Sequence, residues 1–340
     1  MRFIFFLAVF LMACSFLPAQ TLVWDKHASD ALQNSQRLVV VLLDPTDLTT
    51  DKKLLKNKAL FKAYENYTTV FNDMLRQTVP AHWRLTKQID FLTPVEVIGL
   101  RGRATASELE QTLVLHFPKV KNNFLLAAQK LKKSQLAAFD TDKHRIKTDA
   151  GQAIYLHSLN YMTRFAENAV YAGPSFALCT FDGTQGFISA SELAFAVENM
   201  QDLLVKQSKG LCNQPYCWNF DAANKNKLTT KTLLIPQEFV ETAKNGKRTI
   251  TDAELNNAFS MPWKLATWKE IDEAVAKQDA TKAVLFSTRY TTAGPQYGTY
   301  FWAVDALDAR TVLGFSTPVE NGPDGYDLDL RRVGELVRSW

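Results

Sequence analysis

Apolar residues along the chain follow two patterns, one typical of buried strands and one typical of amphipathic helices. Continuous apolar runs at residues 37–43 (RLVVVLL) and 232–235 (TLLI) predict strands that are buried on both faces. Apolar residues recur at helical spacing over residues 58–79 and 190–207, which predicts two long amphipathic helices. The alternation of strands and helices indicates an α/β or α+β fold.

Capping residues and prolines divide the rest of the chain into shorter elements. Thr251 and Glu254 form a capping box, so we expect a helix from residue 252 through Phe259. Pro94 is expected to interrupt one or two strands between residues 83 and 100. Further helices are predicted over residues 107–115, 268–277 and 329–340, and further strands over residues 123–129, 282–288, 300–306 and 312–316.

The two halves of the chain share the same order of predicted elements and several short sequence motifs. Each half begins with an apolar strand closed by proline, VVVLLDP and TLLIP. A Trp-basic-Leu element follows in each, beginning at Trp83 and at Trp263, and an apolar run comes next, beginning at Phe124 and at Val284. We interpret this as an internal duplication of one α/β unit.

The length of the chain suggests two domains. A chain of 340 residues fits roughly two domains at ~150 residues each. The Asn-, Lys- and Thr-rich stretch between residues 208 and 230 is the best candidate for a linker. We therefore predict a first α/β unit with long insertions over residues 20–225 and a second over residues 226–340.

The first nineteen residues predict a signal peptide. Arg2 is followed by an unbroken apolar run from Phe3 to Ala13, which is too short to cross a bilayer of ~30 Å as a helix. We therefore expect the protein to be exported to the periplasm, the cell surface or the medium.

The end of this leader leaves two outcomes open. Residues 11–14 (LMAC) resemble the lipobox of bacterial lipoproteins, which implies cleavage before Cys14 and a lipid anchor on its thiol. Ordinary cleavage after Ser15 or after Ala19 gives a freely soluble product, which we slightly favour. Contact with a membrane is expected only through such an anchor.

The composition excludes several classes of function. The net charge of +4 is too small to indicate nucleic-acid binding. Only 14 glycines occur, without a phosphate-binding loop or a dinucleotide fingerprint, so no nucleotide cofactor is expected. The five histidines form no HxxxH or HExxH motif, so no metal site is predicted.

Two of the four cysteines have the spacing of a local disulfide. Cys212 and Cys217 flank Pro215 in LCNQPYCW, and in an oxidising compartment we expect them to form a bond that pins this loop. A zinc pair is the rival interpretation, but it needs two further ligands nearby.

The candidate site residues fall in two places. Asp44 and Asp47 follow the first buried strand, and carboxylates at the C-terminal end of a strand are well placed for catalysis in α/β sheets. Aromatic residues gather in the second half, and Tyr297, Tyr300 and Trp302 are the candidates for contact with a sugar or a protein. The alternative, which we favour for the strand residues, is that Phe301 or Trp302 faces the core and the others cover strand edges.

These observations favour a binding or structural protein over an enzyme. We expect a non-catalytic protein of the cell envelope whose partner is another protein or a surface polymer. The alternative is a secreted hydrolase whose site is assembled from dispersed Asp and His residues, and it requires these groups to meet in one pocket.

Overall fold

The computed structural model of the protein shows a mixed α/β fold. It describes residues 34–46, 57–118, 152–161, 177–181, 188–211, 224–237, 251–259, 261–291, 297–315 and 319–321, with single positions between 120 and 136 and at 239. The chain separates into two compact units, an N-terminal unit of Thr21–Asn219 and a C-terminal unit that contains Phe220–Trp340. The predicted boundary at residues 225 and 226 lies close to this division.

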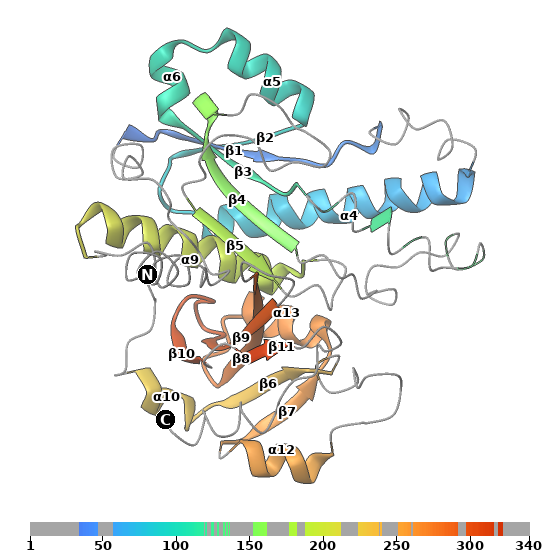
Figure 1. The fold of residues 1–340 in the computed structure, drawn as a ribbon, viewed down its shortest axis with the longest axis vertical. Coiled ribbons are helices and arrows are strands. Elements are labelled where there is room, and N and C mark those ends of the chain that lie inside the picture. Colours follow the sequence, from blue (N-terminus) through green and yellow to red (C-terminus); the bar gives the residue numbers. More distant parts are fainter. Residues whose placement is uncertain are drawn as a thin grey trace, which may run out of the picture. The chain divides into compact units, whose positions relative to one another are not determined.

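The N-terminal unit is built on five strands in the order β2-β1-β3-β4-β5 (Figure 1). Strand β1 runs parallel to β2 and β3, whereas β4 is antiparallel to both β3 and β5. The elements are β1 (Arg37–Val41), α4 (Lys58–His82), β2 (Gln88–Leu92), α5 (Pro94–Arg103), α6 (Ala106–Gln111), β3 (Thr112–His116), β4 (Gln152–Ser158), a short 3-10 helix (Leu159–Tyr161), β5 (Ala177–Phe181) and α9 (Ala190–Ser208).

Helices cover both faces of this sheet. The connections β1–α4–β2 and β2–α5–α6–β3 cross the sheet in opposite directions, so right-handed crossovers place their helices on opposite faces. Val97 of α5 is buried against Val39, Val41 and Val114 of the sheet. On the other face α4 packs against α9, and Tyr64, Tyr67 and Phe71 of α4 belong to its buried stripe.

An asparagine on α4 holds the end of β1. The amide nitrogen of Asn72 donates to the carbonyl oxygen of Leu43 at 3.0 Å, and its amide oxygen accepts from the backbone nitrogen of Leu43 at 3.0 Å. Because Asn72 is buried, this double hydrogen bond satisfies polar groups that water does not reach.

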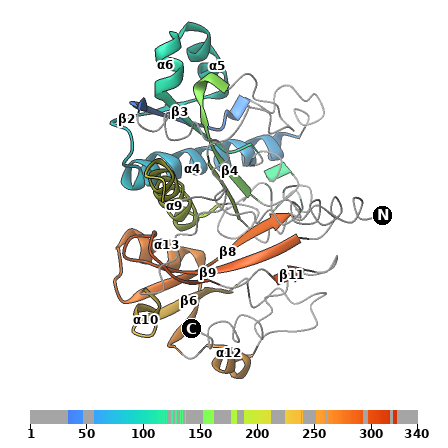
Figure 2. The same cartoon turned by 60° about the vertical axis from the view of Figure 1, so that its left-hand side comes forward.

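The C-terminal unit repeats the strand pattern of the N-terminal unit, in the order β7-β6-β8-β9-β10. Strand β6 runs parallel to β7 and β8, and β9 is antiparallel to β8 and β10. The elements are α10 (Lys225–Leu228), β6 (Thr232–Pro236), α12 (Asp252–Ala258), β7 (Trp263–Ala266), α13 (Trp268–Ala276), β8 (Lys282–Thr291), β9 (Tyr297–Asp305), β10 (Val312–Phe315) and β11 (Val319–Asn321), which also pairs with β9. Figure 2 shows the two long antiparallel strands β8 and β9 of this unit most clearly.

The two long helices and the strands β1, β6, β8, β9 and β10 lie where the sequence predicts them, but three other predicted segments within the described residues differ. The helix predicted over residues 329–340 lies outside the described residues. Residues 107–115, predicted as one helix, are divided between α6 and β3. Positions 124 and 125, predicted as part of a strand, are helical. Pro94, predicted as a break between strands, is the first residue of α5, where a proline costs no hydrogen bond.

Candidate functional site

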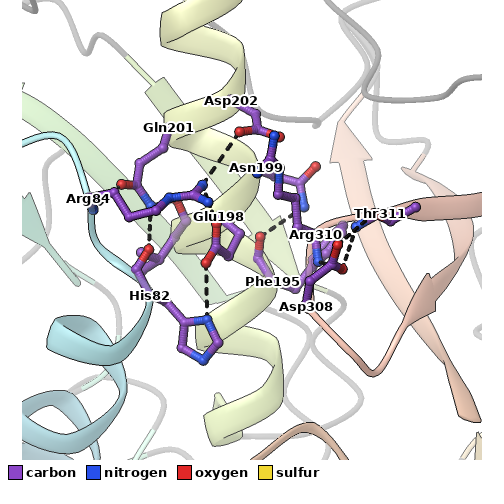
Figure 3. Close-up of polar contacts among 11 residues, drawn as sticks. His82, Arg84, Phe195, Glu198, Asn199, Gln201, Asp202, Asp308, Arg310 and Thr311 are labelled. Carbon is purple, nitrogen blue, oxygen red and sulfur yellow. Dashed lines mark hydrogen bonds and ion pairs between the residues drawn. The ribbon is translucent and has the colours of Figure 1, made fainter. Parts of the chain in front are cut away.

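Five polar side chains meet between the end of α4 and the middle of α9. We call His82, Arg84, Glu198, Gln201 and Asp202 the α4–α9 cluster (Figure 3). Positions 201 and 202 lie about one turn after position 198 on α9, so helical spacing alone brings these side chains close to that of Glu198. The other two members follow from the place where α4 ends.

The carboxylate of Glu198 is the centre of this cluster. Its side chain is only 7% exposed, and Oε1 lies 3.2 Å from Nδ1 of His82. Oε2 lies 2.5 Å from a guanidinium nitrogen of Arg84, which in turn lies 3.5 Å from Asp202. A buried carboxylate is costly unless it is paired, and here it has two cationic or potentially cationic partners.

Gln201 adds neutral hydrogen bonds that fix the end of α4. Its amide oxygen accepts from the backbone nitrogen of Arg84 at 2.6 Å, and its amide nitrogen donates to the carbonyl oxygen of His82 at 2.8 Å. The cluster therefore fastens the last turn of α4 to α9 through both backbone and side-chain groups (Figure 3).

The His82–Glu198 pair supplies two of the three groups of a catalytic triad, the histidine and the carboxylate. A carboxylate that accepts from one ring nitrogen of a histidine can orient the ring as a general base. The third member would be a hydroxyl or thiol bonded to the other ring nitrogen. Across the residues that the structure describes, no such group is hydrogen bonded to His82.

The first predicted catalytic residue, Asp44, closes a local turn. Its Oδ1 accepts from the backbone nitrogen of Thr46 at 2.8 Å and from the Thr46 hydroxyl at 2.6 Å. This arrangement is the ordinary Asx turn of a loop. Asp47, the second predicted carboxylate, lies outside the described residues.

Two histidines and a tyrosine lie together on β3 and β4 of the N-terminal unit. The ring centroids of His116 and His157 are 6.4 Å apart, and Tyr155 stacks on His157 with centroids 5.5 Å apart. Burial and the neighbouring His157 lower the pKa of His116 to about 3, so its ring is neutral at pH 7. Burial also raises the pKa of Tyr155. This group lies on the same face of the sheet as Val114, which is directly opposite His157.

The predicted aromatic binding residues share one strand of the C-terminal unit. Trp302 is 5% exposed, and its indole nitrogen donates to the Thr288 hydroxyl at 2.8 Å, so its ring belongs to the core. Tyr297 and Tyr300 lie in the first half of β9, and their side chains are outside the described part of the chain. Their role in binding stays a prediction.

The three cysteines with predicted roles lie outside the described residues. Cys14, predicted to carry a lipid, and Cys212 with Cys217, predicted to form a disulfide, are therefore not described. Within the described ranges, no group of three or more His, Cys, Asp or Glu residues is placed to hold a metal ion. No helix in these ranges has the length and hydropathy needed to cross a bilayer.

The pairing of His82 with Glu198 was not predicted from the sequence. The two residues are separated by 116 positions, and neither stands in a recognisable motif. The one available signal was the group of polar residues 198–199 and 201–202, which stands between the apolar stretches 193–197 and 203–205 of the helix. Comparisons with protein-family models, with curated protein sequences and with solved structures found no match to this chain.

Proposed function

We propose that this chain is an exported protein of the cell envelope with a non-catalytic binding role, built from two copies of one α/β unit. Its partner is another envelope protein or a surface polymer. The leader at residues 1–19 supports export, and Cys14 supports a lipid anchor on one of its two processing routes.

The observation that carries this proposal is that Asp44 and His82, two groups that a hydrolase could combine, are engaged with different partners. Asp44 is engaged by Thr46, and His82 is engaged by Glu198 on a different pair of elements. Asp44 and His82 are thus each engaged in a contact that stabilises the fold. A hydrolytic site needs a nucleophile, a base and an oxyanion donor within reach of one substrate atom.

The repeated strand order supports the duplication. In both units the first strand pairs in parallel with the second and third, and two antiparallel strands follow. In both units the second strand leads into a helix with a Thr-x-x-Glu capping box, from Thr93 to Glu96 and from Thr267 to Glu270. This correspondence aligns the two units at their capping boxes, with Thr93 equivalent to Thr267.

The short sequence matches between the two halves do not align when the two units are matched at their capping boxes. Trp83 lies just after α4, before the second strand begins, whereas Trp263 is the first residue of β7. Phe124 is helical, whereas Val284 lies in the strand β8. We therefore base the duplication on strand order and capping boxes, not on the tryptophan element.

A photo-crosslinking experiment in the native cell tests the binding role. A benzoyl-phenylalanine is placed at Tyr297, and the matched control carries it at Lys269, an exposed position on α13 of the same unit. We expect a discrete adduct from position 297 that is competed by excess unlabelled protein, and none from position 269. Equal labelling from both positions, or none from 297, would contradict the predicted role of Tyr297 in binding.

The hydrolase alternative and the export are tested separately. Hydrolysis by the purified protein that is lost in His82→Asn would favour an enzyme and overturn the non-catalytic role. The mass of the mature N-terminus distinguishes a lipid on Cys14 from cleavage after Ser15 or Ala19. An intact Met1 on a cytosolic protein would overturn export.

A further inference from the structure

Helix α5 of the N-terminal unit presents an apolar face to solvent. Val95 is 72% exposed and Ile98 is 50% exposed, and both belong to the small set of large apolar side chains that the described residues leave exposed. Both views show α5 beside α6 above the sheet (Figures 1 and 2). Val97 and Leu100, on the opposite side of α5, pack against the sheet.

Two glycines lie on this same exposed face. Gly99 and Gly102 lie one and two turns after Val95, and a Cβ built at either position meets nothing within 4 Å. Glycine is a poor helix former compared with alanine. The described residues give these positions no steric reason for glycine, and the close approach of another backbone is one physical use of glycine at such a place.

Charges at the two ends of α5 are complementary when the helix meets its own copy in antiparallel orientation. Glu96 lies in the first turn and Arg103 in the last, and both flank the same side of the apolar face. A twofold axis perpendicular to two antiparallel helices places Glu96 of one copy beside Arg103 of the other, and the reverse contact forms at the same time. The charged ends of the two helix dipoles are also opposed favourably.

We propose that α5 is the contact through which two copies of this chain associate, with Val95, Ile98, Gly99 and Gly102 at the centre and two Glu96–Arg103 pairs at the rim. A helix of ten residues is only about 15 Å long. It buries much less than the roughly 800 Å² per partner of a standard interface. An interface of that size belongs to the weak, transient class. This association is independent of the envelope partner proposed above.

Glycine-to-alanine variants give the sharpest test, because stability and association should change in opposite directions. Gly99→Ala and Gly102→Ala meet open space in the isolated unit, so each should raise the Tm of the monomer. The added methyl groups separate the two helices, so the double variant should weaken the dimer at least fivefold. Sedimentation velocity of the mature chain from about 1 to 500 µM measures association, and thermal unfolding at low concentration measures stability.

Charge and apolar variants complete the test. Ile98→Lys should remove association below 500 µM, and Arg103→Glu should weaken it several-fold at low salt. Lys269→Glu, an equal change of charge at an exposed residue of α13, should leave it unchanged. A chain that stays monomeric at 500 µM, or a dimer that is indifferent to the double glycine variant, overturns the proposal. Monomeric protein that binds vesicles of anionic lipid and loses this binding in Ile98→Lys also overturns it, because α5 would then contact lipid.

Discussion

The imidazole of His82 lies 3.2 Å from the carboxylate of Glu198, which joins the last turn of α4 to the middle of α9. Arg84 supplies a second partner to the same carboxylate, and Gln201 binds the backbone on either side of Trp83. The end of α4 is thus held by side chains from a helix more than a hundred residues further along the chain.

Removal of Glu198 should destabilise the N-terminal unit. A fully buried ion pair costs ~3–5 kcal/mol when one partner is lost, but the Arg84 side chain is 46% exposed and can return to water. We therefore expect Glu198→Ala to lower the free energy of unfolding by about 2 kcal/mol. Urea denaturation measures this, and Glu65→Ala, at an exposed position of α4, should change it by less than ~0.5 kcal/mol.

A buried ion pair in the C-terminal unit should show strong coupling. Nζ of Lys231 donates to Oδ1 of Asp305 at 2.9 Å and to the carbonyl oxygen of Ala280 at 2.5 Å. Both side chains are less than a tenth exposed. Lys231→Met leaves the carboxylate buried without its cation, so we expect a loss of about 3 kcal/mol in the free energy of unfolding.

The double variant Lys231→Met, Asp305→Asn provides the control for that ion pair. Its loss should be smaller than the sum of the two single losses by at least ~1 kcal/mol, because the neutral amide needs no cation. Additive losses in the thermal unfolding of the four proteins would mean that the ion pair does not carry the effect.

Acid should destabilise the protein through His116. The pKa of this residue is about 3 in the folded chain and 6.5 in the unfolded chain, because burial disfavours the charged ring. Between these values only the unfolded chain binds the proton, so the free energy of unfolding falls as the pH is lowered. The slope from this group is at most about 1.4 kcal/mol per pH unit.

The variant His116→Leu isolates this contribution. Denaturant titrations between pH 8 and pH 4 should give a flatter pH dependence below pH 6.5 than in the parent protein. Above pH 7 the two curves should run parallel, since the ring is then neutral in both states. Equal slopes below pH 6.5 would show that His116 is protonated as readily in the folded state.

Glu270 should titrate at unusually low pH. A hydrogen bond from Lys264 is the main cause that lowers its pKa to about 2, and the backbone nitrogen of Thr267 in the capping box adds to it. Because the pKa is lowered in the folded chain, the stabilisation is present above pH 4.5 and is lost as the pH falls through about 2.

Two single variants separate the causes of that low pKa. Carboxyl NMR titration should show a larger rise in the pKa of Glu270 in Lys264→Met than in Thr267→Ala. Asp279 is a matched reference in the same protein, since Lys282 and Thr281 hold its pKa at about 2 through separate contacts. Its titration should be unchanged in both variants.

Local sequence patterns correctly predicted those helices and strands that are specified by residues within the element itself. The apolar run of β1, the stripe of α4 and the capping box at Thr251 are examples. Strand β3 was missed because its five residues follow α6 without a proline or glycine between them. It is a strand because it pairs with β1 and β4, which no local pattern records.

The candidate site depended even more on contacts between distant segments. The sequence singled out Asp44 because it follows a buried strand, but its turn with Thr46 is settled by the next two residues. The helix that contains Glu198 was predicted correctly, but Glu198 itself was not recognised as a site residue, because an amphipathic pattern does not show which polar residue is buried. The capping box of α5, from Thr93 to Glu96, is visible in the sequence, but Pro94 was interpreted as a break between strands and not as the first residue of a helix.

The double hydrogen bond between Asn72 and Leu43 pairs the backbone at the end of β1 with a side chain of α4, not with a neighbouring strand. One side-chain amide supplies both the acceptor and the donor that a neighbouring peptide group would otherwise offer. Hydrogen exchange at the Leu43 amide should therefore report the detachment of α4 from the sheet, not the opening of the sheet itself. The end of this strand is therefore anchored to α4 by a side chain, independently of the strands on either side of it.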